Sequence, residues 1–221
     1  MSIGNKRIKG VIFDLDGTLI NSIEDIHDSL NIVLELHHHP TIKLKTCSDL
    51  VGNGLRNLLN EALPDEFRKD SYTFRLLSEL KKEYAKRLLN KTCIYEGIDK
   101  MLDDLSIKGY ILCVLSNKLQ KSTQSLVNSL LGKWRFAVVA GATENRPLKP
   151  HPESVRYILN ETGLTVDEMI IVGDGETDVI AAKNTGMKMI AISWGYRNKK
   201  DLYSLKPDFM IDHPGELAKI L

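Results

Sequence analysis

The sequence predicts an α/β protein whose core is a parallel β-sheet covered by helices, with a mainly helical second domain inserted after the first strand. Three observations support this fold class. Apolar runs recur along the chain, end in small or polar residues and alternate with helical patterns. The runs are continuous, which is typical of strands that are buried on both faces of a sheet. One long stretch, by contrast, contains only helical patterns.

Six apolar runs are the expected strands, and helical patterns separate most of them. The runs cover residues 10–14, 110–117, 136–141, 169–175, 187–195 and 208–212. Strands that alternate with helices imply right-handed crossover connections and therefore an open, Rossmann-like sheet. Between the third and fourth runs, Pro152 suits a first helical turn and Gly163 is a natural C-cap. After the fourth run, a helix is expected to begin near Asp178 and to end at Gly186.

Residues 20–90 are predicted to form the helical second domain. Two segments in this range have helical apolar spacing, residues 23–36 and 74–89, and no strand-like run accompanies them. The core is then built from residues 1–19 and 91–221. Turn-forming residues place the candidate hinges at Asn21 and between Asn90 and Gly97.

Three consecutive histidines, His37, His38 and His39, lie in this helical segment. Three adjacent residues of a regular helix cannot all face one metal ion. Because Pro40 ends the element, a solvated helix terminus is the favoured interpretation.

Composition and charge exclude several classes of function. The chain of 221 residues is 43% hydrophobic and 27% charged, and its formal net charge is +1, which argues against nucleic acid or an anionic membrane as the main partner. No apolar segment is long enough for a secretory signal or a membrane span. The three cysteines are widely spaced and form no CxxC pair, which indicates reduced thiols. We therefore expect a cytoplasmic protein.

Residues capable of catalysis follow the expected strands at their carboxyl ends, where open α/β sheets bind ligands. They are Asp14 and Asp16 after the first strand, Ser116 and Asn117 after the second, Lys149 before the helix that starts near Pro152, and Asp174 and Asp178 after the fourth. Each of them alone has an ordinary interpretation as a cap, a turn or a solvated side chain. However, Asp14 and Asp16 are two residues apart in an extended segment and face the same way. Two such carboxylates require a cation, a proton or a reaction to offset their repulsion.

Taken together, these residues indicate phosphoryl chemistry. Three carboxylates at one strand edge favour Mg²⁺, which prefers oxygen ligands. A lysine and a hydroxyl beside them favour an anion that binds across the metal. Phosphate fits, because its oxygens repel an attacking carboxylate until cations neutralise them. One aspartate can then attack phosphorus while a second one transfers the proton of the leaving oxygen.

Four segments resemble the motifs of the haloacid dehalogenase superfamily. They are FDLDGTL, LSN, LKPHPE and VGDGETD, in this order and spacing. The resemblance implies that Asp14 is the nucleophile and that Asp16 is the general acid and base. An acid at position 16 favours phosphoryl transfer, because the dehalogenases themselves lack it. The insert after the first motif is similar to the small helical cap domain of this superfamily, which closes over the core and selects the substrate.

The same resemblance implies the remaining roles. It assigns Ser116, with its neighbour Asn117, and Thr18 to phosphate binding. It assigns Lys149 to both phosphate binding and charge neutralisation in catalysis. Asp174 and Asp178 are assigned to Mg²⁺, with Asp14 and the backbone carbonyl of Asp16 completing the metal ligands. The chain departs from the pattern at Gly175, where many relatives have serine. This departure puts the surroundings of the metal acids in question but leaves the chemistry intact.

Two further segments, VGNGLRNLL (51–59) and WGYRN (194–198), resemble phosphoglycolate phosphatases within the superfamily. The glycines of residues 52–57 can bring backbone close to a ligand, and Arg56 offers a fork of donors to a carboxylate. We therefore predict that this segment, with Gly52 and Arg56, faces the Asp14 pocket when the cap closes, and that Arg56 binds the non-phosphate end of an anionic substrate. The alternative is that Gly52 and Gly54 form a turn before an amphipathic helix and that Arg56 is a surface charge.

The leading hypothesis is a Mg²⁺-dependent phosphatase that acts on a small phosphorylated metabolite, as a monomer or a homodimer. One alternative is a phosphosugar mutase of the β-phosphoglucomutase type, which uses the same residues but returns the phosphoryl group to the sugar. Another alternative is a phosphoacceptor domain like a bacterial receiver. Receivers are single domains of about a hundred residues, which counts against this alternative.

Overall fold

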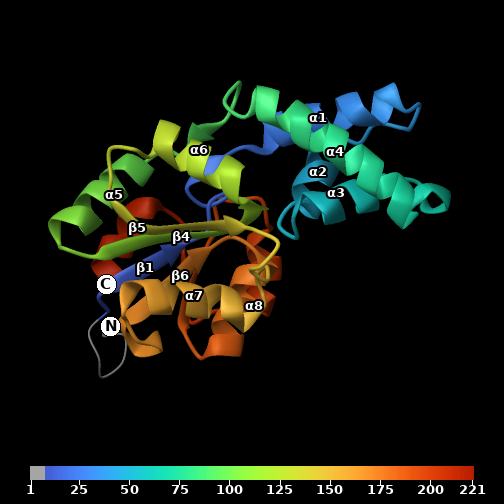
Figure 1. Ribbon diagram of the computed structural model, residues 1–221. Helices are drawn as coiled ribbons and strands as arrows, with labels where there is room; N and C mark the ends of the chain where they lie inside the picture. Colours follow the sequence, from blue (N-terminus) through green and yellow to red (C-terminus); the bar gives the residue numbers. More distant parts are fainter. Residues whose placement is uncertain (1–7) are drawn as a thin grey trace.

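The structure is a computed structural model that describes residues 8–221 (Figure 1). A six-stranded sheet with the order β5-β4-β1-β6-β7-β8 forms its centre, and all neighbouring strands are parallel. The strands are β1 (Gly10–Phe13), β4 (Ile111–Leu119), β5 (Phe136–Ala142), β6 (Met169–Gly173), β7 (Lys188–Ile192) and β8 (Phe209–Ile211). The predicted α/β fold with a parallel sheet is therefore confirmed. Each strand overlaps one of the six predicted runs, although β6 and β7 end earlier than predicted.

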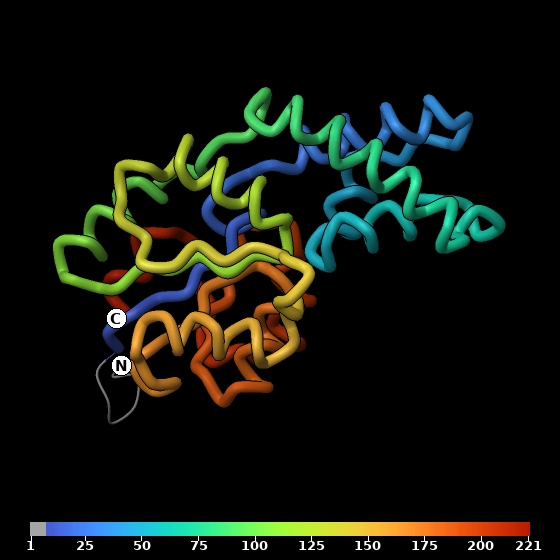
Figure 2. Tube along the Cα trace, in the orientation of Figure 1, coloured from blue at the N-terminus to red at the C-terminus, as the bar shows by residue number. Residues whose placement is uncertain are grey.

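Helices cover both faces of the sheet (Figures 1 and 2). Successive residues of β1 alternate between the two faces: Val11 and Phe13 belong to one apolar cluster and Ile12 to the other. The first cluster includes residues of α5 (Ile98–Ile107), α6 (Gln120–Leu130) and α10 (Leu217–Ile220). The second includes residues of α7 (Pro152–Thr162) and α8 (Glu176–Thr185), while α9 (Lys199–Ser204) follows β7. The helix α8 begins two residues before the predicted start at Asp178, because Gly175 is its N-cap.

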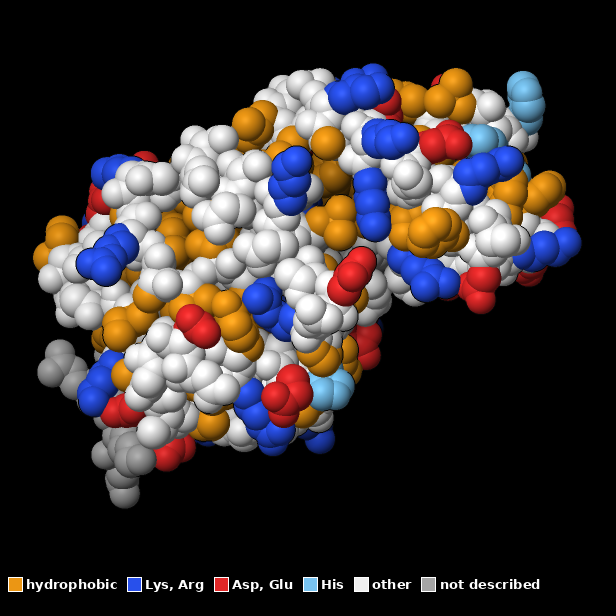
Figure 3. Space-filling model, viewed as in Figure 1, with side chains coloured by type: hydrophobic (Ala, Val, Ile, Leu, Met, Phe, Trp, Pro, Cys, Tyr) orange, Lys and Arg blue, Asp and Glu red, His pale blue; other side chains and the backbone are white. Residues whose placement is uncertain are grey.

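Four helices form a unit with its own apolar core, which we call the helical insert. They are α1 (Ile23–Leu36), α2 (Leu44–Leu50), α3 (Leu55–Ala62) and α4 (Asp70–Arg87). Side chains from all four helices meet in one buried cluster, for example Leu30, Cys47, Leu59 and Leu80. Figures 1 and 2 show the insert projecting from one end of the sheet. On the face shown in Figure 3, basic and acidic side chains are interspersed and the outline is indented where the insert joins the core.

The two connections between core and insert lie side by side, which the sequence did not predict. The short strands β2 (Ile20–Asn21) and β3 (Cys93–Ile94) pair antiparallel at this junction. The buried carboxylate of Asp25 in α1 then accepts hydrogen bonds from the backbone N–H of Lys91 and from the N–H and hydroxyl of Thr92. The junction therefore contains a hydrogen-bonded ribbon, with turns at residues 88–90 and 96–97 on either side of β3.

The prediction that the three histidines form a solvated helix end is wrong for His39. The helix α1 ends at Leu36, and His39 is buried, with its Nε2 2.6 Å from the hydroxyl of Tyr72. The Nε2 atom of His37 lies 2.7 Å from Oε2 of Glu79. The imidazoles of these two histidines thus have separate partners within the insert.

Two predictions from composition can be compared with the structure. No helix within residues 8–221 has both the length and the apolar character needed to cross a membrane. All three cysteines are free, and Cys47 and Cys113 are buried in different apolar clusters.

Candidate active site

The predicted acids and Lys149 meet at the carboxyl edge of the sheet. Asp14 follows β1, and its N–H donates to the carbonyl of Val172 in the neighbouring strand β6. Asp174 follows β6 directly, and Asp178 lies in the first turn of α8. Adjacent parallel strands end at the same edge, so residues 160 positions apart in the chain become neighbours here.

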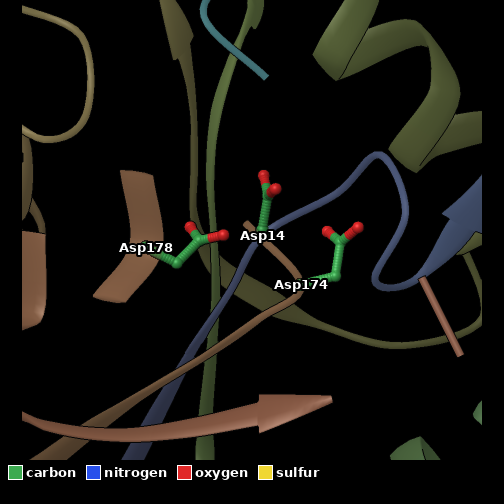
Figure 4. Close-up of side chains that lie close together, drawn as sticks. All are labelled: Asp14, Asp174 and Asp178. Carbon is green, nitrogen blue, oxygen red and sulfur yellow. The ribbon is translucent and has the colours of Figure 1, made fainter. Parts of the chain in front are cut away.

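The carboxylates of Asp14, Asp174 and Asp178 form a compact cluster. Each offers one oxygen, and these three oxygens all lie within 4.8 Å of one another. Figure 4 shows the three side chains projecting into the same region from β1, the loop after β6 and α8. A set of hard oxygen ligands at this spacing fits a divalent cation such as Mg²⁺.

Lys149 compensates part of the charge of this cluster. Its Nζ lies 2.8 Å from Oδ1 of Asp14 and 2.7 Å from Oδ1 of Asp178. The lysine side chain is 2% exposed and that of Asp178 is fully buried. The two carboxylates raise the pKa of Lys149 against the effect of its burial, so the lysine is a cation.

Burial and mutual repulsion raise the pKa values of two acids of the cluster. Burial raises the pKa of Asp14 to about 8, and the negative charges of Asp178 and Asp174 act in the same direction, whereas Lys149 opposes the shift. Burial and the charge of Asp178 raise the pKa of Asp174 to about 6. A cation bound between these oxygens would offset the repulsion, and the three carboxylates could hold one.

Glycines allow the backbone to approach these acids closely. A Cβ atom on Gly195 would lie 2.3 Å from the Cβ of Asp174, and one on Gly173 would lie 2.4 Å from the carboxylate of Asp178. Gly175, the departure noted in the sequence, donates its N–H to Oδ2 of Asp178. A Cβ there would come to 3.1 Å of the same oxygen, which is tight.

Asp16 lies outside this cluster and has its own partners. Its Oδ1 accepts hydrogen bonds from the hydroxyl of Ser22 and from Nζ of Lys118, the latter at 2.8 Å. Its side chain faces the cavity described below, while the predicted metal ligand was its backbone carbonyl. The carboxylate is thus separate from the metal cluster, as a proton-transferring group requires.

The three predicted phosphate-binding residues differ in their positions. Ser116 lines the cavity, and its hydroxyl accepts a hydrogen bond from the N–H of Lys118. The hydroxyl of Thr18, by contrast, is buried and donates to Oδ1 of Asp174. The hydroxyl of Thr18 thus orients an acid of the cluster, and the predicted phosphate contact of its loop stays a prediction.

Asn117 braces the loop that carries Lys149. Its amide donates to the carbonyls of Gly52 and Lys149, and its Oδ1 accepts from the N–H of Lys149. The side chain amide is therefore bonded to backbone partners, and its predicted phosphate contact stays a prediction.

A cavity of about 850 Å³, counting its open mouth, lies between these residues and the helical insert. The core contributes Asp14, Asp16, Ser116, Lys118, Asp174 and Arg197 among others, and the insert contributes Val51, Gly52, Asn53, Gly54, Leu55 and Tyr84 among others. Residues 52–55 of the predicted segment 52–57 thus line the same cavity as Asp14.

Arg56 does not line this cavity, and its predicted role when the insert closes stays a prediction. Its Nη2 donates to Oδ1 of Asp70 at 2.8 Å, and its side chain is 64% exposed. The arginine that borders the cavity is Arg197, whose guanidinium donates to the carbonyls of Ser48 and Val51 at the end of α2. It thereby connects the core to the insert.

This difference predicts unequal effects of two arginine substitutions. Arg197→Ala removes two charge-assisted hydrogen bonds between core and insert, so we expect KM to rise about tenfold or more for a small anionic phosphate ester. Arg56→Ala removes one exposed ion pair and should change KM by less than about twofold. Steady-state kinetics of both variants test this. A larger effect of Arg56→Ala would support the role predicted from the sequence.

Sequence reasoning missed the residues around Asp16. Lys118 directly follows the LSN motif, but a lysine in that position has no distinctive local pattern. Tyr196 and Arg197 lie in the segment WGYRN, which the sequence analysis singled out without assigning any roles to its residues. The backbone N–H of Tyr196 donates to Oδ2 of Asp174 at 2.7 Å, and its hydroxyl accepts from the N–H of Ser22.

Comparison with known proteins gives a consistent result. Residues 11–192 match the family of haloacid dehalogenase-like hydrolases. The chain is 31% identical over 211 residues to a phosphoglycolate phosphatase of Aquifex aeolicus, covering 96% of this chain and 95% of that protein. It is 29% identical to the phosphoglycolate phosphatase of Mannheimia succiniciproducens, over 98% and 100% of the two chains. A crystal structure of a predicted phosphoglycolate phosphatase from Haemophilus somnus superposes with a TM-score of 0.89 at 27% identity, covering 98% of this chain and 99% of the other.

Proposed function

The chain belongs to the haloacid dehalogenase-like hydrolase family, and from this premise we propose that it is a Mg²⁺-dependent phosphatase that cleaves a small phosphate monoester, with phosphoglycolate as the first candidate. The resemblance to this family that the sequence suggested is confirmed. The candidate substrate comes from the relatives, which are phosphoglycolate phosphatases.

One observation supports the proposal more than any other. A nucleophile candidate, Asp14, lies at the bottom of a cavity beside a buried lysine and two further carboxylates. Oδ1 of Asp14 accepts the N–H of Leu15 and lies next to Lys149, whereas no residue within 8–221 donates to its Oδ2. One oxygen is thus fixed in place and the other is left to attack phosphorus.

Asp14 and Asp16 have different roles in the proposed reaction. Asp14 forms a bond to phosphorus while the bond from phosphorus to the ester oxygen breaks, which gives an aspartyl-phosphate. Asp16 gives its proton to the departing oxygen and then takes a proton from the water that hydrolyses the aspartyl-phosphate. Lys149 lies beside the attacking carboxylate and offsets negative charge on the transferred group.

The acids Asp14, Asp174 and Asp178 would hold the Mg²⁺ ion. The ion would neutralise phosphoryl oxygens and align the group for in-line attack. The helical insert acts as a cap in this proposal, because it supplies one wall of the cavity and excludes water from the reacting atoms. A cytoplasmic location is part of the same proposal, since small phosphorylated metabolites are the substrate class.

The test is phosphate release from a panel of phosphoglycolate, sugar phosphates, nucleotides and pyrophosphate, with Mg²⁺ and with a chelator. We expect release that depends on Mg²⁺ and matches substrate consumption mole for mole. Isomerisation of a sugar phosphate with little phosphate release would favour a mutase instead. A phosphorylated protein that does not turn over would favour a receiver-like phosphoacceptor.

Fluoride complexes offer a second test of the aspartyl-phosphate. Beryllium fluoride and aluminium fluoride resemble a phosphoryl group bound to a carboxylate, so they should inhibit strongly when Mg²⁺ is present. Phosphate release that persists at saturating concentrations of both complexes would contradict a covalent intermediate at Asp14.

A further inference from the structure

The cavity is lined by two cations of the described chain, Lys118 and Arg197, and only the first has a carboxylate partner. Nζ of Lys118 lies 2.8 Å from Oδ1 of Asp16. Arg197 forms no ion pair with any carboxylate of residues 8–221, and both of its hydrogen bonds go to backbone carbonyls. Arg197 is therefore the cation of the cavity whose charge is left for an anionic group of a ligand.

The guanidinium of Arg197 is held in place before any ligand binds. Its Nη1 donates to the carbonyl of Ser48 and its Nη2 to that of Val51. A guanidinium has five N–H donors in one rigid plane, so three donors remain, and no residue within 8–221 accepts from them. A planar group that the protein already orients loses little conformational entropy when it binds a carboxylate.

The wall of the cavity that the insert supplies has no charged side chain. It is formed by apolar and small or neutral polar residues, namely Ile26, Val51, Gly52, Asn53, Gly54, Leu55, Leu58 and Tyr84. The core adds the acids Asp16 and Glu176, which would repel a second anionic group of a substrate. An ion-pair partner for such a group can therefore come only from Arg197 among the unpaired residues that line the cavity.

The position of Arg197 is fixed by a close approach of the insert to the core. A Cβ atom on Gly52 would lie 3.3 Å from Nη2 of Arg197, and Gly52 has a φ of 126°, which disfavours any other residue. The carbonyl of Gly52 accepts a hydrogen bond from the amide of Asn117 in the core. The guanidinium thus lies where the two walls of the cavity meet.

We propose that Arg197 binds a second anionic group of the substrate, a carboxylate close to the phosphate, and so determines which phosphate monoesters bind. The inference rests on the proposed phosphatase function and gives Arg197 the role that the sequence predicts for Arg56. The phosphate end lies at Asp14 and Lys149, and the remaining N–H groups of Arg197 donate to the carboxylate. A substrate with an uncharged end leaves these donors without an acceptor in a partly closed cavity and binds more weakly.

The test compares two ligands that cannot be hydrolysed, 3-phosphonopropionate and its amide, 3-phosphonopropanamide. They have the same shape and differ in the charge at the end remote from phosphorus. Calorimetric titration with Mg²⁺ present gives the Kd of each ligand for the wild type, for Arg197→Ala and for the control Arg156→Ala. Arg156 is an exposed arginine of α7 that does not line the cavity, so its removal changes the net charge equally.

We expect the wild type to bind the acid at least about tenfold more tightly than the amide, and Arg197→Ala to lose this preference. Arg156→Ala should keep it. If Arg197→Ala weakens both ligands equally, the proposal is overturned, because Arg197 then only joins the insert to the core. Wild-type protein that binds the amide as tightly as the acid would overturn it too, as would loss of the preference in Arg56→Ala in place of Arg197→Ala.

The variant Arg197→Lys covers the case in which Arg197→Ala folds poorly. Lysine keeps the positive charge but has no planar fork that can bond two carbonyls and a carboxylate together. We expect a preference for the acid that is smaller than in the wild type and still measurable. Equal affinity of Arg197→Lys for both ligands would show that the charge at position 197 does not select the acid, and the proposal would fail.

Phosphate release separates this inference from the proposed function. If no compound of the panel yields phosphate while the preference for the acid depends on Arg197, the proposed function is wrong and the anion-binding role of Arg197 remains. If phosphoglycolate is hydrolysed and the preference for the acid is unchanged in Arg197→Ala, the function remains and the inference is overturned.

Discussion

The Asp14→Asn variant is expected to lose phosphatase activity by a factor on the order of 10⁴ or more while its fold is retained. The amide keeps the size of the side chain but cannot attack phosphorus as a carboxylate does. Asp14 is the only member of the cluster that combines a free oxygen with a place on the cavity wall beside Lys149. Phosphate release by the purified variant, measured with Mg²⁺ present, tests this. Activity within about tenfold of the wild type would show that Asp14 is not the nucleophile.

The same substitution should stabilise the protein without metal, and the gain should depend on pH. Burial, together with the charges of Asp178 and Asp174, raises the pKa of Asp14 from its ordinary 3.8 to about 8. The folded wild type therefore holds a proton that the unfolded chain loses, and its stability declines as pH rises from about 4 to about 8. Asparagine does not titrate. The stability of the variant relative to the wild type should thus be lowest near pH 4 and highest above pH 8.

Thermal unfolding in the presence of a chelator measures this difference. Glu161→Gln is the matched control, because Glu161 is an exposed acid of α7 with no partner within the described residues. It should show neither the loss of activity nor the gain in stability that grows with pH. A pH-independent difference between Asp14→Asn and the wild type would mean that Asp14 is ionised at all these pH values in the folded protein.

The convergence of the acids could be predicted from the sequence for a physical reason. Continuous apolar runs specify buried parallel strands, and parallel strands end at a common edge, so residues directly after those runs must meet. This reasoning needs only local patterns and a topological rule. It placed Asp14, Asp174 and Lys149 together, as the structure shows.

Contacts between core and insert could not be predicted in the same way. Whether Arg56 or Arg197 borders the cavity depends on how α3 is rotated and on where the loop after β7 lies. The periodic spacing of apolar residues in the sequence specifies neither of these. The pairing of β2 with β3 involves only two residues on each side, which is too short for a strand signal. The contact of Lys118 with the ring of Tyr84 was missed because Tyr84 belongs to a distant helix.

Lys149→Met is expected to have the largest effect on stability. Lys149 lies between the carboxylates of Asp14 and Asp178, at 2.8 and 2.7 Å, and its side chain is 2% exposed. Removing one partner from a buried ion pair leaves an uncompensated buried charge, which costs about 3–5 kcal/mol. We therefore expect a large drop in the melting temperature without metal and phosphatase activity near background. Lys121→Met, which removes an exposed lysine, serves as the control and should change neither.

Mg²⁺ and a second substitution show whether the loss of the Lys149 charge causes the expected loss of stability. In Lys149→Met, a bound cation can replace the positive charge that the three clustered carboxylates have lost, so saturating Mg²⁺ should raise the melting temperature more than it does in the wild type. Lys149→Met/Asp178→Asn removes the charge that Lys149 contacts in α8, and the metal-free protein should recover part of the lost stability while remaining inactive. If the double variant is instead less stable than Lys149→Met, the loss reflects packing of the lysine side chain. Lys149 would then stabilise the loop before α7 through its aliphatic portion and not through its charge.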